Sequence, residues 1–109
     1  MNFSERNKLA HSYYKTGDIE KAIELYELNV QLDAQTPATY NRLITIYRKK
    51  NDPNNQLRIL RKLLIIELEQ LKTFENADKQ NIRYTLNLEK QKLVIEFIRK
   101  TIEKLQCSR

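Results

Sequence analysis

Two ten-residue stretches decide the fold of this 109-residue chain: LAHSYYKTGD at residues 9–18 and LITIYRKKND at residues 43–52. They lie 34 residues apart, and this offset superimposes four pairs of identical residues: Leu9 on Leu43, Tyr13 on Tyr47, Lys15 on Lys49 and Asp18 on Asp52. Just before the two stretches, it also superimposes Asn7 on Asn41. The offset also places Gly17 on Asn51, and both residue types favour the left-handed conformation that ends a helix. The chain therefore contains two copies of one helix–turn–helix unit.

Turn and capping residues divide the chain into five predicted helices. We expect them at about residues 5–16, 19–32, 37–50, 53–75 and 78–106. Ser4 and Asp18 are expected N-caps, and Pro37 and Pro53 mark the first turns of the third and fourth helices. The only later break, at residues 76–78, is weak. No segment alternates with a period of two, so the predicted fold class is all-α.

The first copy carries a wider pattern of spaced residues: Arg6, Leu9, Ala10, Tyr13, Ala22, Tyr26 and Ala34. This pattern resembles the tetratricopeptide repeat (TPR), in which an aromatic residue, Leu-Gly, Tyr, Ala, Phe and Pro follow one another at the same spacing within a 34-residue unit. Arg6 and Ala34 depart from the pattern. The second copy aligns Tyr40, Leu43, Ile44, Tyr47, Gln56, Leu60 and Leu68. The resemblance covers residues 3–68, and a third unit starting near Leu71 does not match.

The resemblance implies where helices come close together. Ala22 occupies a position where the family has a small residue, and small residues allow paired helices to approach closely. The second copy has Ile44 and Gln56 where the family has Gly and Ala, so we expect its helices to be more splayed.

The C-terminal part differs from a repeat. Residues 53–106 are predicted to form a long antiparallel helical hairpin, because apolar residues on both helices follow heptad spacing, interrupted by Glu67 and Gln91. The fifth helix is apolar on more sides than one partner helix can cover, so we expect a homodimer. The expected interface residues are Leu93, Val94, Phe97, Ile98, Ile102 and Leu105. The alternative is a monomer in which the fifth helix bends back along the repeats.

Candidate partner-binding residues follow from the resemblance, because the first helix of each TPR pair lines a concave groove. The groove-facing residues would be Asn7, His11, Tyr14, Lys15, Asn41, Thr45, Arg48 and Lys49. Asn side chains can both donate to and accept from a peptide backbone, and Lys and Arg can bind carboxylates. The alternative is that these residues form an ordinary solvated helix face.

The same sequence argues against catalysis. His11 and Cys107 are the only His and Cys, which leaves no nucleophile–base pair and no metal-ligand spacing. With a single Gly, the chain also lacks a phosphate-binding loop. We therefore expect no enzymatic activity, no metal and no cofactor.

Charge and hydropathy limit the possible partners and locations. The net charge is +6, and most of the excess lies after Asn54, where twelve Lys and Arg oppose seven Asp and Glu. The cations are interleaved with Glu, so nucleic-acid binding by the C-terminal half is the alternative and not the preferred function. The absence of a long apolar stretch, of a signal-peptide pattern and of paired cysteines predicts a cytoplasmic protein with no membrane contact.

Together these features predict one domain, residues 1–109, that works as a small TPR-like adaptor. It would bind a protein or peptide without catalysis.

Overall fold

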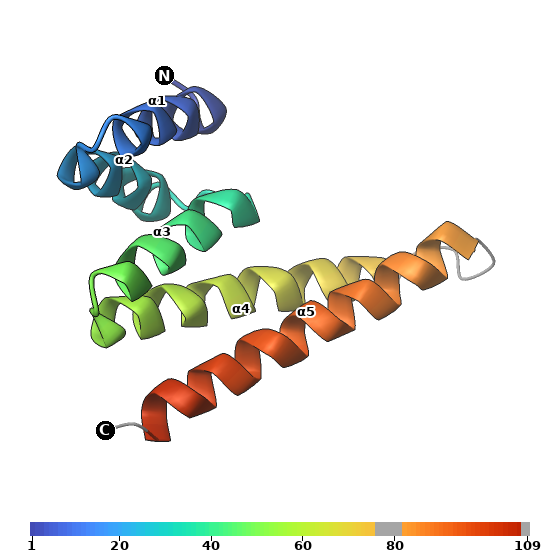
Figure 1. The fold of residues 1–109 in the computed structure, drawn as a ribbon. Coiled ribbons are helices and arrows are strands. Elements are labelled where there is room, and N and C mark those ends of the chain that lie inside the picture. Colours follow the sequence, from blue (N-terminus) through green and yellow to red (C-terminus); the bar gives the residue numbers. More distant parts are fainter. Residues whose placement is uncertain (76–81, 108–109) are drawn as a thin grey trace. The chain divides into compact units, whose positions relative to one another are not determined.

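The computed structural model describes residues 1–75 and 82–107, and within these residues the chain forms five helices and no strand (Figure 1). The helices are α1 (Phe3–Lys15), α2 (Ile19–Gln31), α3 (Pro37–Lys49), α4 (Pro53–Glu75) and α5 (Ile82–Cys107). The predicted all-α class with about five helices is confirmed. The break predicted at residues 76–78, and the expected start of the fifth helix, lie outside the described residues.

The chain divides into two compact units, Met1–Ile59 and Leu60–Arg109, here called unit 1 and unit 2. The boundary between the two units falls within α4. The sequence analysis predicted a single domain, residues 1–109. Unit 1 contains α1, α2, α3 and the first residues of α4. Unit 2 contains the rest of α4 and all of α5.

The end of α1 shows how local hydrogen bonds fix the first turn. Gly17 has a φ of 92°, a left-handed conformation that costs glycine little. The N–H of Asp18 donates to the carbonyl oxygen of Tyr13 at 2.9 Å, and the N–H of Gly17 donates to that of Tyr14 at 3.2 Å. This pair of bonds is a Schellman motif, which satisfies carbonyl groups at a helix end.

The end of α3 repeats this geometry 34 residues later. Asn51 has a φ of 55°. The N–H of Asp52 donates to the carbonyl oxygen of Tyr47 at 2.9 Å, and the N–H of Asn51 donates to that of Arg48 at 3.1 Å. In the two copies identified from the sequence, equivalent backbone N–H and C=O groups therefore form the same hydrogen bonds at the turn.

The helix after each turn is also capped in the same way. The side chain of Asp18 accepts from the N–H of Lys21, and that of Asp52 accepts from the N–H of Asn55, both at 3.3 Å. A side-chain oxygen in this position satisfies a donor that the helix leaves free.

The predicted cap of α1 is wrong by two residues. Asn2, and not Ser4, is the N-cap, and its side chain accepts from the N–H of Glu5 at 2.8 Å. Both residue types cap helices well, so local preference alone does not choose between them. The helix begins at Phe3, whose carbonyl oxygen accepts from Asn29 of α2 at 3.2 Å, so a contact between helices holds the earlier start.

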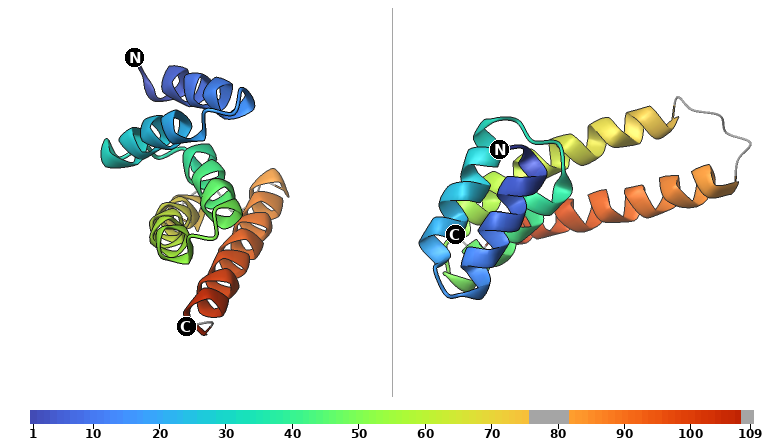
Figure 2. Two further views of the ribbon diagram at one scale, coloured as in Figure 1. Left: turned by 60° about the vertical axis from the view of Figure 1, so that its left-hand side comes forward. Right: turned by 90° about the horizontal axis from the view of Figure 1, so that it is seen from above.

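Small residues lie in the interior of unit 1, where α1 and α2 pack closely along their lengths. Ala10 and Ala22 are fully buried. Figure 2 shows α1 and α2 side by side as a hairpin. Large buried side chains, among them Tyr26 and Leu43, complete this core.

A buried polar network joins α1, α2 and α3. Asn29, which is fully buried, accepts from the guanidinium of Arg6 at 2.6 Å and donates to the side-chain oxygen of Asn7 at 2.8 Å. The same oxygen of Asn7 accepts from the hydroxyl of Thr39 at 2.8 Å. The hydrogen bonds of Arg6 and Asn7 therefore satisfy the buried side-chain amide of Asn29.

A second polar link joins α2, α3 and the start of α4. One carboxylate oxygen of Glu27 accepts from the hydroxyl of Tyr47 at 2.6 Å and from the guanidinium of Arg58 at 2.5 Å. Burial and the bond to Glu27 raise the pKa of the Tyr47 hydroxyl above its usual range. Tyr47 is therefore a neutral donor at physiological pH.

In unit 2, α5 runs antiparallel to α4 (Figures 1 and 2). Ile66 of α4 and Ile95 of α5 are among its buried apolar residues. The two polar residues that interrupt the apolar stripes meet, because the side-chain amide of Gln91 donates to both the carboxylate and the backbone carbonyl of Glu67. A buried carboxylate that accepts hydrogen bonds costs less than an unpaired one.

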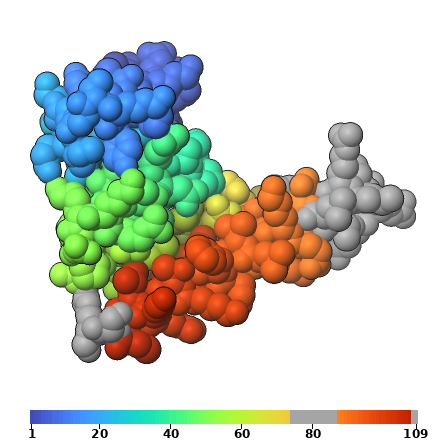
Figure 3. Space-filling model, in the orientation of Figure 1, coloured from blue at the N-terminus to red at the C-terminus, as the bar shows by residue number. Residues whose placement is uncertain are grey.

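The outer surface of α5 exposes large apolar residues. Leu93 and Phe97 are each 71% exposed, and Val94 is also exposed. Figure 3 shows one side of α5 at the molecular surface, coloured orange to red. Ile98, which the sequence analysis predicted to lie in a dimer interface, is only 3% exposed in the single chain. Its heptad position turns it into unit 2, while Ile102 and Leu105 are half-buried.

Candidate functional site

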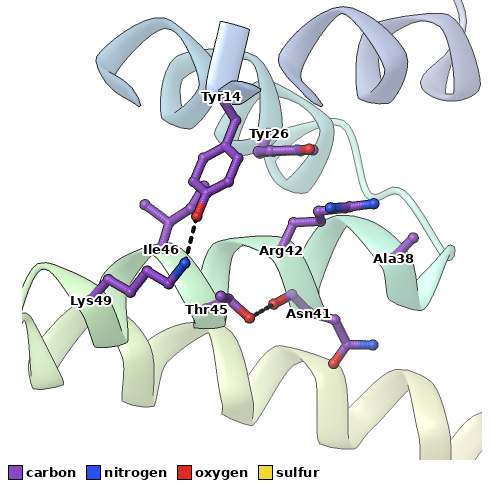
Figure 4. A pocket seen from close by; sticks show the side chains of 8 residues that line it. All are labelled: Tyr14, Tyr26, Ala38, Asn41, Arg42, Thr45, Ile46 and Lys49. Atoms are coloured by element: carbon purple, nitrogen blue, oxygen red, sulfur yellow. Dashed lines mark hydrogen bonds between the residues drawn. The ribbon is translucent and has the colours of Figure 1, made fainter. Parts of the chain in front are cut away.

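A pocket with a volume of about 530 Å³ lies in unit 1. Helices α1, α2 and α3 all contribute side chains to it (Figure 4). Its lining residues are Tyr14, Tyr26, Ala38, Asn41, Arg42, Thr45, Ile46 and Lys49. We call it the main pocket.

A smaller pocket of about 170 Å³ adjoins the main pocket. It is lined by Asn7, Lys8, His11, Tyr26, Ala38 and Arg42, and we call it the recess. Tyr26, Ala38 and Arg42 line both pockets, so the two form one continuous concave surface.

Most of the predicted groove residues are brought together here. Those that line one of the two pockets are Asn7, His11, Tyr14, Asn41, Thr45 and Lys49. Lys15 and Arg48, which were also predicted, are exposed and lie outside the lining of both pockets. Each is one residue from Tyr14 or Lys49 along its helix, and a step of one residue turns a side chain by about a quarter of the helix circumference.

The three residues that line both pockets, Tyr26, Ala38 and Arg42, are not among the groove residues predicted from the sequence. A signal for Arg42 exists, because Ala38, Arg42, Thr45 and Lys49 recur at helical spacing on one side of α3. Tyr26 occupies a core position of the repeat pattern, and nothing in its spacing indicates that its ring edge also lines a pocket.

At the rim of the main pocket, α1 and α3 are joined through Tyr14 and Lys49. The ammonium of Lys49 donates to the hydroxyl of Tyr14 at 2.8 Å and lies 5.6 Å from the centre of its ring (Figure 4). The second dashed line in the figure is the bond from the Thr45 hydroxyl to the carbonyl oxygen of Asn41, at 3.0 Å. The amide of Asn41 is left free to meet a ligand, since no described residue hydrogen-bonds to it.

Asn7 has a different role from the one predicted. Its side-chain oxygen accepts from both Asn29 and Thr39, so this acceptor is already used within the fold. Asn7 lines the recess and joins α1 to α2 and α3 through these two hydrogen bonds. The spacing of residues in the sequence does not reveal these contacts.

Three polar groups at the recess lack partners among the described residues. The hydroxyl of Tyr26 and Nδ1 of His11 are buried and make no hydrogen bond. The guanidinium of Arg42 makes neither a hydrogen bond nor an ion pair within residues 1–75 and 82–107. Figure 4 shows Tyr26 and Arg42 projecting into the main pocket from α2 and α3.

The electrostatic environment of this surface is positive. The two pockets are lined by the cations Lys8, Arg42 and Lys49, and no acidic residue is among their lining residues. Burial, together with Arg42 and Lys15, lowers the pKa of His11, because each of these disfavours the imidazolium. Burial raises the pKa of the Tyr26 hydroxyl, so that group stays protonated and able to donate.

Other kinds of site are not found in the part of the chain that the structure describes. There, no three His, Cys, Asp or Glu side chains come together in a way that could hold a metal ion. None of the described helices combines the length and apolar character needed to cross a bilayer.

Comparisons of the chain with protein-family models, with curated proteins and with solved structures find no match.

Proposed function

We propose that this chain is a non-catalytic, TPR-like adaptor that binds an extended segment of another protein across the main pocket. The observation that carries the proposal is the main pocket itself, a concavity of about 530 Å³ formed by α1, α2 and α3. This volume falls in the range of roughly 300–1,000 Å³ typical of ligand sites.

The lining chemistry supports a peptide ligand. Asn41 offers both amide donors and an acceptor, as a peptide backbone requires. Arg42 offers a planar array of donors that suits a carboxylate or a carbonyl group. Tyr14 and Ile46 offer apolar surface for side chains of the bound segment.

The TPR-like part of the proposal is supported by the turn geometry. The Schellman bonds and the Asp caps recur at an offset of 34 residues, which is the length of a TPR unit. Small buried residues at Ala10 and Ala22 match the first copy of the pattern.

The test is a selection from a phage-displayed library of random linear peptides on the full chain. Selected peptides should lose about tenfold or more in affinity with Asn41→Ala or Arg42→Ala, because a hydrogen bond to a charged or buried group contributes about 1.5–3 kcal/mol. Fluorescence polarisation of labelled peptides gives the affinities.

Arg48→Ala is the matched control. Arg48 is an exposed arginine on the same helix, outside the pocket lining, so its removal changes the net charge as Arg42→Ala does. Peptides that bind all three variants as well as they bind the wild type would refute the main pocket as the binding site.

We also propose that two copies of the chain pair through the outer surface of α5. Leu93 and Phe97 are separated by one helical turn and are both 71% exposed, and large exposed apolar patches commonly mark interaction sites. A two-fold pair would cover the same patch on each copy.

Light scattering on reduced protein tests the pairing. The expected mass is twice 13.1 kDa, and Leu93→Glu combined with Phe97→Glu should halve it. A wild-type mass of 13.1 kDa at micromolar concentration would rule out the pair. Reduction is needed because Cys107 is exposed and a disulfide between copies would imitate a dimer.

Nucleic-acid binding by the C-terminal half is less favoured. The exposed cations of α5 alternate with Glu89, Glu96 and Glu103, and Lys100 lies 3.9 Å from Glu96. A gel-shift titration over salt tests it, because nucleic-acid binding would weaken steeply as the salt concentration rises.

A further inference from the structure

The first helix–turn–helix copy exposes a face that the second copy buries. In the second copy, Leu43 is fully buried and Tyr47 is 6% exposed. Helix α2 lies against this side of α3, because the Tyr47 hydroxyl donates to the carboxylate of Glu27 on α2. The matching residues of the first copy, Leu9 and Tyr13, are only half-buried. The same face therefore receives a helix in the second copy and stays partly exposed in the first.

This exposed face extends onto α2. Leu25, Leu28 and Leu32 follow helical spacing on one side of α2 and its C-cap, and Leu28 and Leu32 are 38% and 52% exposed. A hollow of about 160 Å³ between α1 and α2 is lined by Leu9, Tyr13, Lys21, Glu24 and Leu25. Helix α1 lies at one end of unit 1, with α2 between it and α3 (Figure 1). We call this surface the end face, and it comprises Leu9, Tyr13, Leu25, Leu28 and Leu32.

The end face is suited to a helix. A groove lined by apolar side chains from two helices accepts the apolar side of an amphipathic helix. The second copy supplies the template, because its matching face is covered by the single helix α2. No end-face residue lines the main pocket or the recess, so this surface is separate from both.

The charge at the end face indicates what the docked helix carries. In the second copy, Tyr47 and Arg58 both donate to Glu27. At the 34-residue offset, Arg58 matches Glu24, an exposed residue that makes no ion pair within residues 1–75 and 82–107. The hydroxyl of Tyr13 makes no hydrogen bond within these residues either. A Glu at this place would be repelled by Glu24, whereas a Lys or Arg would pair with it and donate to the Tyr13 hydroxyl.

Lys21 does not supply this cation. Its ammonium lies 5.2 Å from the centre of the Tyr13 ring, and its counterpart in the second copy is Asn55 and not Arg58. Lys21 therefore covers the ring of Tyr13 and leaves the hydroxyl for a ligand.

We propose that the end face binds an amphipathic helix of another protein, with a Lys or Arg of that helix placed against Glu24 and Tyr13. The bound helix would lie on the end face as α2 lies on α3, and its apolar side would cover Leu25, Leu28 and Leu32. This inference goes beyond peptide binding in the main pocket, because it gives the chain a second interaction surface with a different kind of ligand.

The probe is a synthetic helix that copies α2, the helix on the matching face. It has the sequence of residues 18–32, a fluorescent label and a covalent staple on the side that faces away from α3 in the protein. A second probe is identical except for Glu27→Lys. Fluorescence polarisation with the full-length protein measures the affinity of each probe.

The Glu27→Lys probe should bind about fivefold more tightly than the unchanged probe, because it exchanges a repulsion by Glu24 for an attraction. The net charge of the protein is +6, so non-specific attraction would favour the unchanged, more acidic probe. Glu24→Arg, which copies Arg58, should reverse the order of the two probes. Equal affinities for the wild type, or an order that survives Glu24→Arg, would refute the proposed contact.

Two apolar variants test the surface itself. Leu28→Glu combined with Leu32→Glu should weaken both probes about tenfold or more, and thermal melting checks that the fold is kept, since both residues are exposed. Leu93→Glu is the matched control, because Leu93 is an exposed Leu on α5. Probes that bind the double variant as well as the wild type would overturn the proposal. A double variant with half the wild-type mass in light scattering would also overturn it, because a second copy of the chain would then cover the end face.

Discussion

The two helix–turn–helix copies of unit 1 share their turns and differ in their interiors. The backbone bonds at Gly17 and Asn51 are the same, as are the caps formed by Asp18 and Asp52. At the packing positions the first copy has the fully buried Ala22 and the second has the larger Gln56. The binding surface differs too, because His11 of the first copy corresponds to Thr45 of the second.

The turns depend on local sequence, whereas the interiors depend on tertiary contacts. A Schellman turn needs only the residues at the end of one helix, so it recurs wherever suitable residues recur. A packing position depends on the opposite helix, so the same place in the pattern accepts Ala in one copy and Gln in the other. A substitution in one copy can therefore be compared with a substitution at the matching position of the other copy.

The largest effect is expected at the packing position. Ala22→Leu adds bulk where α1 and α2 pack closely and should destabilise the protein by about 1–3 kcal/mol. Gln56→Leu exchanges side chains of similar size and should cost clearly less. Urea denaturation followed by circular dichroism measures both, and equal losses would contradict the difference between the copies.

The next effect concerns the turns. Gly17→Ala places a Cβ at a φ of 92°, where no neighbouring atom lies within 4 Å, so the cost comes from the backbone alone. It should be about 1–2 kcal/mol. Asn51→Gly removes a side chain from the same conformation and should be nearly neutral. A tolerated Gly17→Ala, judged by thermal melting, would mean that the first turn has rearranged.

A smaller effect is expected at the paired tyrosines. Tyr47→Phe removes the hydrogen bond to Glu27 and should cost about 0.5–1.5 kcal/mol. Tyr13→Phe, in the first copy, removes only the hydroxyl and keeps the ring, whose centre lies 5.2 Å from the ammonium of Lys21. It should change stability by less than about 0.5 kcal/mol. The urea midpoints of the two variants should therefore separate; coincident midpoints would show that the link through Glu27 contributes nothing.

The smallest effect is a pH dependence present only in the first copy. The pKa of His11 is lower in the folded protein than in the unfolded chain, so the unfolded chain binds a proton more readily. Above pH 6.5, His11 is neutral in both states and protonation costs no stability. As the pH falls below 6.5, protonation favours the unfolded chain, and the protein becomes less stable. His11→Thr, which copies Thr45, should flatten this part of a stability–pH curve. A wild-type curve that coincides with that of the variant would contradict the assignment.

Much of the candidate site could be predicted because it follows from helix spacing. His11 lies on the polar side of the first helix and Asn41 on the polar side of the third helix. The 34-residue offset shows that these two helices occupy equivalent places in the two copies. The lining residues that were not predicted depend on how the helices pack against one another. Tyr26 occupies a core position, and it also lines the recess.

By itself the sequence determined the five helices, the places where they end and the existence of two related copies. The ends of α1 and α3 depend on hydrogen bonds between residues close in the chain, and Gly17, Asn51 and the capping residues Asp18 and Asp52 form these two turns. The tertiary structure decided which polar groups pair and which remain free. Asn7 accepts hydrogen bonds from Asn29 and Thr39, and Gln91 donates to Glu67. Within residues 1–75 and 82–107, the hydroxyl of Tyr26 and the guanidinium of Arg42 make no hydrogen bond. Each outcome depends on side chains that only folding brings into contact.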